Sequence, residues 1–214
     1  MRLRDHEVLT FCADDAHGAP IMMKADELGI EPTAFIDEIN KNHQESLAKF
    51  GIEYTNYYST HSKENEALVS EIYLDAKSSG YIYKKEIEQC FDEEKQMFLA
   101  DRYVVGECPK CSAKDQYGDG CEECGATYSA TELINPKSSL SGTTPITKIS
   151  EHIFFDLEKT KDDLVNFLDN SSIQKPILGK LSEWLDGDLK SWDISRDAPY
   201  FGFQIHDETK KYFY

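Results

Sequence analysis

The sequence predicts an α/β fold, because short apolar runs that suit buried strands alternate with longer amphipathic segments that suit helices. Residues 7–13, Glu-Val-Leu-Thr-Phe-Cys-Ala, form a mostly apolar run, as in a strand buried on both faces of a parallel sheet. A helix, a second helix, a strand and a third helix are predicted to follow in order as far as residue 80. Two Cys-x-x-Cys pairs after residue 100 add a third observation, a compact metal-binding knuckle.

Proline and glycine set the predicted ends of the first two helices. Pro20 opens the first helix, which ends near Gly29, and Pro32 opens the second, which ends at Gly51. Side chains recur along the second helix at steps of nearly four residues, which predicts one buried face. These side chains are Phe35, Ile39, His43, Leu47 and Phe50.

The next two elements continue this alternation. Residues 52–59, rich in tyrosine and threonine, are predicted to form a strand. Ser62 is then placed to cap a helix that runs to Gly80. The predicted core positions of this helix are Leu68, Ile72 and Ala76.

From residue 81 the pattern changes to shorter strands and polar connections. Strands are predicted at residues 81–84, 97–99 and 149–156, with an acidic turn at residues 92–94. Helices are predicted at residues 157–169 and 175–187, with core positions at Leu181, Trp184, Leu185 and Leu189. Residues 138–144 and 195–202 are predicted loops, and residues 203–214 contain two strand-like pieces.

The strongest signal of a site comes from Cys108, Cys111, Cys121 and Cys124. A gap of two residues lets both sulfurs of a pair turn toward one centre, and four thiolates form a closed tetrahedral site that suits zinc. Because no coordination position stays open, we expect one structural zinc ion per chain. The alternatives are two disulfides, four unligated thiols, or a thiol–disulfide oxidoreductase that uses one pair.

Composition limits the partners and the compartment. The chain has 214 residues, 40% hydrophobic content and a formal net charge of −17, which describes a globular protein with ample material for a core. So acidic a surface is a poor match for a phosphate backbone, so we expect no DNA binding and no RNA binding by the knuckle itself. No apolar run is long enough to span a membrane and no signal-peptide pattern is found, so we expect a cytoplasmic protein without a membrane partner. In that reducing compartment Cys12 and Cys90 are expected to be buried thiols.

The segment Asp14-Asp15-Ala16-His17-Gly18 directly follows the first predicted strand. In open α/β sheets, ligands bind in the crevice beyond the carboxyl ends of the strands. Asp15 is therefore a candidate for binding the ammonium group of an amino acid or a metal-bound nucleotide, and the following helix N-terminus could receive an anion. The alternative is that Asp15 only caps the helix and His17 fills a gap.

Arg196 lies in the predicted loop at residues 195–202. A planar guanidinium suits carboxylate and phosphate groups, so Arg196 is a candidate anion contact. The alternative is a surface pair with Asp197 that contributes little to stability. Several histidines have no spacing that suggests a metal site or a catalytic triad, and we expect them to be structural: His43, His61, His152 and His206.

Several motifs, in this order along the chain, resemble those of bacterial methionyl-tRNA synthetases, a class I family. They are Phe11-Cys-Ala-Asp-Asp-Ala-His-Gly-Ala-Pro-Ile21, Thr60-His-Ser62, Met97-Phe-Leu-Ala-Asp-Arg102, the two cysteine pairs with Asp115-Gln-Tyr-Gly-Asp119 between them, and Trp192-Asp-Ile-Ser-Arg-Asp-Ala-Pro-Tyr-Phe-Gly202. The resemblance runs along essentially all 214 residues, and the ordered set is far more specific than any one motif.

The resemblance implies a more detailed fold. It would be an incomplete Rossmann-like catalytic domain with an inserted α+β connective domain that bears the zinc knuckle. Residues 1–62 would belong to the catalytic domain, and residues 63–212 would form the connective domain, with the knuckle at about residues 104–128. Residues 213–214 would begin the return to the catalytic domain.

The resemblance also implies a function. The family joins methionine and ATP, with Mg²⁺, as methionyl-adenylate and then transfers the methionyl group to tRNA(Met), whose acceptor end reaches a site that the insertion helps to shape. Asp15 matches the family's strand-end aspartate, associated with the methionine ammonium group and with adenylate formation. Arg196 matches the arginine that works with this aspartate near the same substrate, and the four cysteines match the zinc ligands.

Large parts of the family's pattern are missing from these 214 residues. They lack the His-Ile-Gly-His signature expected upstream and the Lys-Met-Ser-Lys-Ser loop expected downstream, which handle ATP and the adenylate transition state. The aromatic methionine pocket and the helical anticodon-binding domain are missing too. We therefore expect an internal segment of a larger enzyme that is inactive alone. The alternative is a non-catalytic, zinc-stabilised interaction module derived from a synthetase.

Overall fold

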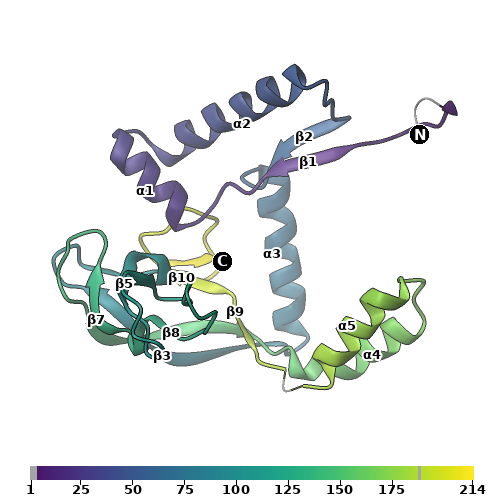
Figure 1. Cartoon of the computed structure of the whole chain (residues 1–214). Helices are drawn as coiled ribbons and strands as arrows, with labels where there is room; N and C mark the ends of the chain where they lie inside the picture. Colours follow the sequence, from purple (N-terminus) through teal and green to yellow (C-terminus); the bar gives the residue numbers. More distant parts are fainter. Residues whose placement is uncertain (1–3, 188) are drawn as a thin grey trace. The chain divides into compact units, whose positions relative to one another are not determined.

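The computed structural model describes residues 4–187 and 189–214 and divides into two compact units. Unit 1 contains the residues up to Val69 together with Asp197–Tyr212, and unit 2 contains Ser70–Arg196 with Phe213–Tyr214. The first boundary falls within helix α3 (Lys63–Ser78), which therefore contributes to both units. Figure 1 shows the elements along the chain.

Unit 1 is built on two parallel strands, as the α/β prediction requires. Strand β1 (Phe11–Asp14) pairs with β2 (Asn56–Ser59), and helices α1 (Ala19–Leu28) and α2 (Pro32–Lys49) connect them (Figure 1). A parallel pair needs such a crossover connection, because the chain must return to the same end of the sheet. Both strands are shorter than the predicted ranges 7–13 and 52–59.

The prediction that the first strand is buried on both faces is wrong for these residues. Leu9 is 59% exposed and Phe11 is 67% exposed. A sheet of two strands is too narrow to bury both faces of either strand. Leu9 and Phe11 are therefore exposed in spite of their apolar side chains.

Helix ends in unit 1 follow the proline and glycine signals. Pro20 and Pro32 occupy the first turns of α1 and α2, where a missing backbone N–H costs nothing. Gly29 (φ 66°) terminates α1 in the left-handed conformation, and Gly51 (φ 69°) follows α2 in the same conformation. The predicted buried face of α2 is only partly correct, because Ile36 is its buried residue. Of the predicted face, Phe35, Ile39 and Leu47 are half-buried, whereas His43 and Phe50 are exposed.

Helix α3 begins as predicted but buries a different face. The Ser62 hydroxyl accepts a hydrogen bond from the backbone N–H of Asn65 at 3.2 Å, which caps the helix. Tyr73 is its buried residue, whereas the predicted core positions Leu68 and Ile72 are 54% and 58% exposed. Ile72 lies one residue from Tyr73 and Leu68 lies five residues from it, so the two side chains are rotated from Tyr73 by about 100° and about 140° around the helix axis.

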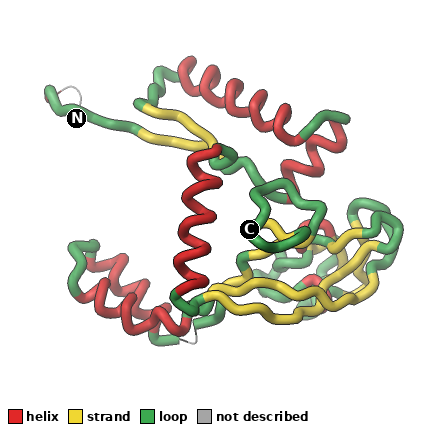
Figure 2. The backbone as a smooth tube through the Cα atoms, turned by 180° about the vertical axis from the view of Figure 1, so that it is seen from behind, coloured by secondary structure: helices red, strands yellow, loops and turns green. Residues whose placement is uncertain are grey.

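The main sheet of unit 2 is antiparallel, with strand order β4-β3-β8-β9. Its strands are β3 (Ile82–Asp92), β4 (Met97–Phe98), β8 (Ile146–Phe155) and β9 (Trp192–Asp193). Strand β3 extends well past the predicted range 81–84 and pairs along its length with β8, from Ile82 opposite Phe155 to Phe91 opposite Ile146. Figure 2 shows this long two-stranded ribbon from behind. The predicted acidic turn at residues 92–94 begins at the last residue of β3 and continues into the turn that leads to β4.

A second, three-stranded sheet carries the cysteine pairs. Its strands are β5 (Val104–Glu107), β6 (Gln116–Tyr117) and β7 (Ile134–Ser138), in the order β6-β5-β7. None of them was expected from the sequence, and Ser138 of the predicted loop 138–144 belongs to β7. Short 3₁₀ turns flank the sheet at Asp101–Tyr103 and Ala130–Glu132.

Helices α4 (Lys161–Asp169) and α5 (Lys175–Leu185) form a hairpin at one end of the β3–β8 ribbon (Figure 2). A 3₁₀ turn at Glu158–Thr160 precedes α4, so the predicted helix 157–169 starts later than expected. Leu157, Leu185 and Leu189 form the buried cluster, which confirms two predicted core positions. Trp184 is 44% exposed, so its predicted core position is wrong.

The last strands revise the predicted end of the chain. Strand β10 (Ser195–Asp197) pairs with β11 (Lys211–Phe213), so the predicted loop 195–202 begins as a strand. Of the two strand-like pieces expected in residues 203–214, one is β11 and the other is a single bridge between Gln204 and Tyr212. Within the described part of the chain, no helix has the length and apolar character needed to cross a bilayer.

Candidate functional site

The structure brings the four predicted metal ligands together. The sulfurs of Cys108, Cys111, Cys121 and Cys124 all lie within 4.8 Å of one another. Cys108 Sγ is 3.8 Å from Cys124 Sγ, and Cys111 Sγ is 3.6 Å from Cys121 Sγ. The first cysteine of each pair is buried and the second is exposed.

Both cysteine pairs lie in turns with the same backbone hydrogen bonds. In the first turn, Cys108 N–H donates to the carbonyl of Ala113 at 2.8 Å, and Ser112 N–H donates to the carbonyl of Cys108 at 2.9 Å. In the second turn, Cys121 N–H donates to Ala126 at 2.9 Å and Gly125 N–H donates to Cys121 at 2.9 Å. The position after the second cysteine is left-handed in both turns, with φ 60° at Ser112 and φ 71° at Gly125. Two matching turns thus face each other and aim four sulfurs at one point.

This donor set fits zinc. A tetrahedral ion with Zn–S bonds of about 2.3 Å needs sulfurs about 3.8 Å apart, which matches the two measured contacts. Backbone N–H groups also point at sulfur, from Lys110 to Cys108 Sγ at 3.3 Å and from Cys124 to Cys121 Sγ at 3.4 Å. Such donors stabilise thiolates, which are the ligating form. Four sulfurs meeting at one point favour a metal site over a redox centre that uses one pair.

At the end of β1 the tightly held carboxylate is Asp14. Asp14 accepts hydrogen bonds from the Tyr57 hydroxyl at 2.5 Å and from Asn40 Nδ2 at 2.6 Å, and it pairs with His43 Nδ1 at 2.7 Å. Burial raises the pKa of Asp14, but hydrogen bonds from Tyr57, His43 and Asn40 outweigh this effect and hold the pKa below its ordinary value. Asp14 therefore joins β1, α2 and β2 as an ionised group.

Asp15 has a different environment. It is exposed, and the next residue anchors the turn, because Ala16 N–H donates to Thr60 Oγ1 at 2.8 Å. Since no further contact restrains the Asp15 carboxylate among the described residues, it is available to a ligand. The structure does not show the predicted helix-capping role, since α1 has Gly18 as its N-cap residue and no side-chain cap.

His17, expected at most to fill a gap, belongs to an aromatic cluster within unit 1. Its Nε2 lies 2.8 Å from His61 Nδ1, and its ring meets Phe201 and Phe203 edge-on, with centroids 5.5 and 4.7 Å away. The His61 ring stacks on Phe203 at 5.3 Å. Burial and then the neighbouring His61 lower the pKa of His17, while Asp15 acts in the opposite direction. This cluster fixes the turn that carries Asp15.

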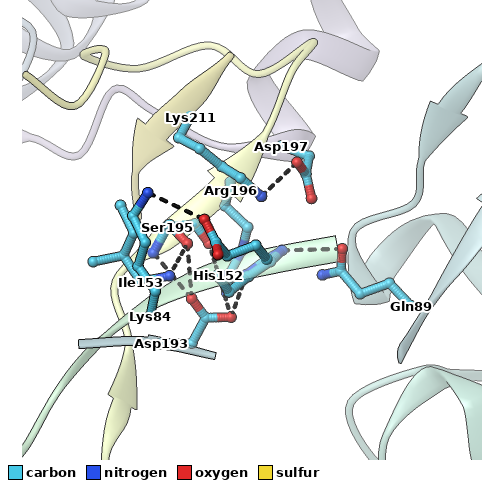
Figure 3. Close-up of polar contacts among 10 residues, drawn as sticks. Lys84, Gln89, His152, Ile153, Asp193, Ser195, Arg196, Asp197 and Lys211 are labelled. Carbon is cyan, nitrogen blue, oxygen red and sulfur yellow. Dashed lines mark hydrogen bonds and ion pairs between the residues drawn. The ribbon is translucent and has the colours of Figure 1, made fainter. Parts of the chain in front are cut away.

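Arg196 is half-buried in unit 2 and contacts three residues, of which Figure 3 shows Asp193 and Ser195. Its Nη1 donates to the Ser195 carbonyl at 2.7 Å and lies 3.6 Å from Asp193 Oδ2. Its guanidinium carbon lies 3.6 Å from the centroid of the Tyr214 ring. The suggested surface pair with Asp197 is not formed, because Asp197 bonds to Lys211 at 2.6 Å. Asp15 and Arg196 belong to different units, so their cooperation remains a prediction.

The contacts of Asp14, of the His17–His61 pair and of His152 were not predicted from the sequence. The contacts of Asp14 and the His17–His61 pair join residues 26 to 44 positions apart, so no local spacing reveals them. His152, expected to be merely structural, is fully buried and contacts Asp193 and Gln89. Of the two remaining cysteines, Cys90 is buried as predicted, whereas Cys12 is only half-buried.

Comparison with known families decides the classification. The family described as tRNA synthetases class I (M) matches residues 1–214, the whole chain. The chain belongs to the class I tRNA synthetases. The α/β fold predicted from the sequence is therefore the fold of a class I synthetase catalytic domain.

Solved synthetase structures agree in fold. Two structures of Mycobacterium tuberculosis methionyl-tRNA synthetase, both with methionyl-adenylate, match all of this chain with a TM-score of 0.66 and 15% identity. The apo form of the same enzyme matches 85% of this chain, with a TM-score of 0.51 and 13% identity. At these identities the likeness establishes the fold alone. This synthetase chain spans 38% of the length of the adenylate-bound structures.

Proposed function

We propose that this chain is part of a methionine–tRNA ligase. The complete protein would join methionine and ATP, with Mg²⁺, as methionyl-adenylate and transfer the methionyl group to the acceptor end of tRNA(Met). The observation that carries the proposal is the match of the family, tRNA synthetases class I (M), over the whole chain. Three solved structures that share its fold are methionyl-tRNA synthetases, two of them bound to methionyl-adenylate.

Asp15 and Arg196 would contact the substrate in this reaction. Asp15 is exposed at the end of a parallel strand, where α/β sheets bind ligands, and its carboxylate would accept the ammonium group of methionine. Arg196 would contact an anionic group of the substrate, since its guanidinium is fixed in direction. Catalysis in this scheme rests on positioning and on stabilising charge at the reacting phosphate.

The four cysteines would hold one structural zinc ion. The ion would fix the two facing turns and, through them, the sheet β6-β5-β7. A site with four protein ligands leaves no position for substrate, so this ion would take no part in the chemistry.

Residues 63–212 would form the connective domain inserted in the catalytic domain of residues 1–62. The compact unit Ser70–Arg196 supports an insertion of about this extent. Unit 1 also includes Asp197–Tyr212, so the return to the catalytic domain would begin before residues 213–214, the point inferred from the sequence.

Pyrophosphate exchange tests the proposed reaction. The full-length protein should exchange pyrophosphate into ATP in the presence of methionine and not with leucine, and Asp15→Asn should lower this rate at least about 10²-fold. The 214-residue chain alone should show background exchange only. A full-length protein that binds zinc but shows no methionine-dependent exchange would contradict the proposal and favour the zinc-stabilised interaction module.

A further inference from the structure

Arg196 belongs to a network of polar groups in unit 2, of which His152 and Ser195 are buried. The network starts at Gln89 on β3, passes through His152 on β8 to Asp193 on β9, and ends at Arg196 on β10 (Figure 3). Every link lies within unit 2. The three positions lie on adjacent antiparallel strands, and the contact of Gln89 with His152 is diagonal, because the register places Lys148 opposite Gln89.

His152 has both ring nitrogens engaged in a fully buried position. Its Nδ1 lies 2.7 Å from Asp193 Oδ2, and its Nε2 meets the side-chain amide of Gln89 at 3.1 Å. Because an ionised carboxylate only accepts hydrogen bonds, Nδ1 carries the proton and donates it toward Asp193. The two contacts hold the imidazole ring in one orientation, with Nδ1 facing Asp193 Oδ2 and Nε2 facing the amide oxygen of Gln89.

Asp193 uses both carboxylate oxygens. Oδ1 accepts from the Ser195 backbone N–H at 3.0 Å and from the Ser195 hydroxyl at 3.2 Å. Oδ2 accepts from His152 and lies 3.6 Å from Arg196 Nη1. The Ser195 hydroxyl is itself fixed, because it accepts from the backbone N–H of Ile153 at 2.9 Å. Asp193 cannot rotate without breaking several of these bonds.

These contacts fix the orientation of the Arg196 guanidinium group. Nη1 is fixed by the Ser195 carbonyl and faces Asp193, while the face of the guanidinium lies on Tyr214. Among the described residues, the hydrogen bond to Ser195 and the ion pair with Asp193 use Nη1 and not Nη2 or Nε, and the Asp101 carboxyl also interacts electrostatically with Arg196. Because the guanidinium group is planar, fixing one nitrogen by a hydrogen bond and one face by an aromatic ring also fixes the directions of its other N–H groups.

We propose that Asp193, oriented by His152 and Gln89, is the positioning residue for Arg196. It fixes the direction in which the guanidinium meets an anionic substrate group. This inference rests on the proposed function, because Arg196 needs a substrate to act upon. A network that only joined strands β8, β9 and β10 would affect stability without acting through Arg196.

A double-mutant cycle in the full-length protein separates these two roles. Asp193→Asn keeps the size of the side chain but removes its charge, and we expect kcat/KM for methionine in pyrophosphate exchange to fall about 10²-fold. In an Arg196→Lys background, the same substitution should cost less than about twofold, because the directed guanidinium is already gone. Asp193→Glu, which keeps the charge, should restore part of the activity.

Glu151→Gln is the matched control. Glu151 precedes His152 on β8 and forms an exposed ion pair with Lys84 at 3.1 Å. Its loss should change neither kcat/KM nor the melting temperature by a measurable amount. If Asp193→Asn fails to fold, Gln89→Leu applies a milder change at the outer end of the network, and the same cycle with Arg196→Lys then decides. If exchange by Arg196→Lys is too slow to measure, methionine affinity from equilibrium dialysis replaces kcat/KM.

The outcomes are distinct. Equal fold losses in the presence and absence of Arg196→Lys would overturn the positioning role, and so would an Asp193→Asn protein with unchanged kinetics. A wild-type full-length protein without methionine-dependent exchange would instead overturn the proposed function. Non-additive losses together with an unaffected Glu151→Gln protein would establish the positioning role.

Discussion

Asp14 and Asp15 are neighbours in the sequence, yet only one of them is bound into the structure. Asp14 receives donors from Tyr57, Asn40 and His43, whereas Asp15 is exposed. Strand geometry explains the division, because successive side chains along an extended chain point to opposite sides. One carboxylate thus holds unit 1 together, and the other remains for a ligand.

The two aspartates should therefore respond differently to the same substitution. Asp14→Asn loses a charged acceptor for several hydrogen bonds and should lower the free energy of unfolding by about 1–3 kcal/mol. Asp15→Asn, at an exposed position, should change it by less than about 0.5 kcal/mol. Urea denaturation followed by circular dichroism measures both.

Asp14 also has a defined pH dependence. Its folded pKa lies below the ordinary value of 3.8, so its contribution is fully present above pH 3.8 and is lost as the pH falls through the folded pKa. Asp14→Asn should remove this acid-dependent loss. Equal destabilisation by both substitutions, or an unchanged acid profile in Asp14→Asn, would contradict the assignment.

The interaction of His17 with His61 can also be tested by titration. Since burial and the charge of His61 lower the pKa of His17, its titration midpoint should lie below 6.5. Replacing His61 with Gln removes the repulsion and should raise that midpoint. Nuclear magnetic resonance of the imidazole protons measures both values. A His17 midpoint that does not move in His61→Gln would show that the two rings do not interact electrostatically.

The same pair predicts a stability change near neutral pH. A histidine with a lowered pKa favours the neutral form in the folded state, so the unfolded chain binds the proton first as the pH falls below 6.5. Stability should therefore decrease from about pH 7 downward until the folded pKa is reached. His17→Asn should show a shallower decrease over this range.

The cysteine ligands could be predicted at the residue scale, but the carboxylate and histidine contacts could not. Two-residue gaps place sulfurs together through local backbone geometry alone. The contact of His152 with Gln89, by contrast, joins residues 63 positions apart, and it depends on the register of β3 with β8. The register depends on tertiary structure, because it is set by which side chains of both strands are buried on the same face of the sheet.

Among the elements, the long helices and the short strands β2 and β4 could be predicted, whereas strands β5, β6, β7 and β9 could not. Proline and glycine mark the ends of α1 and α2, so their limits are close to the predicted ones. Strands β6 and β9 contain two residues each, too few to show an alternating pattern. Strand β6 forms because it pairs with β5, and β9 forms because it pairs with β8. These pairings depend on the tertiary structure and leave no pattern in the sequence.

Two glycines test how closely these short elements pack. A Cβ on Gly118 would lie 2.6 Å from Ala130 Cβ and 2.8 Å from the Asp101 carbonyl oxygen. Gly118→Ala should therefore destabilise unit 2 by about 1–3 kcal/mol. Gly179, inside α5, has nothing within 4 Å of the same position, so Gly179→Ala should stabilise the helix by about 0.5–1 kcal/mol.

Thermal unfolding measures this pair of variants. The contrast isolates close packing, because neither glycine has a positive φ and alanine fits both backbones. A Gly118→Ala protein as stable as the wild type would mean that β6 and the turn at Ala130–Glu132 can separate without cost.

On the scale of the whole molecule, the chain combines a unit with a parallel strand pair and an antiparallel unit that carries the four-cysteine cluster. The alternation of strand and helix predicts the first, and the cysteine spacing predicts the metal site of the second. The large antiparallel ribbon β3–β8 was underestimated, because exposed charged residues such as Lys84 and Glu86 interrupt its apolar pattern. An exposed ribbon needs few apolar residues once its backbone is paired.

Metal removal should affect only one of the two units. Elemental analysis should find one zinc per chain, and both chelation and Cys111→Ser should speed proteolysis within residues 104–128. Hydrogen exchange in α1 and α2 of unit 1 should stay unchanged. Cys12→Ala, which alters a thiol outside the quartet, should keep its zinc. A metal-free protein with a protease-resistant knuckle would contradict this dependence.

The pairing of sulfurs across the knuckle has one more consequence. The contacts at 3.8 and 3.6 Å join Cys108 to Cys124 and Cys111 to Cys121, so each links one turn to the other. Peroxide that expelled the ion would therefore find thiols already adjacent between the turns. Peptide mapping of the oxidised protein should locate cross-links there rather than inside each pair. The four-cysteine cluster would then also be a site of oxidative damage in unit 2.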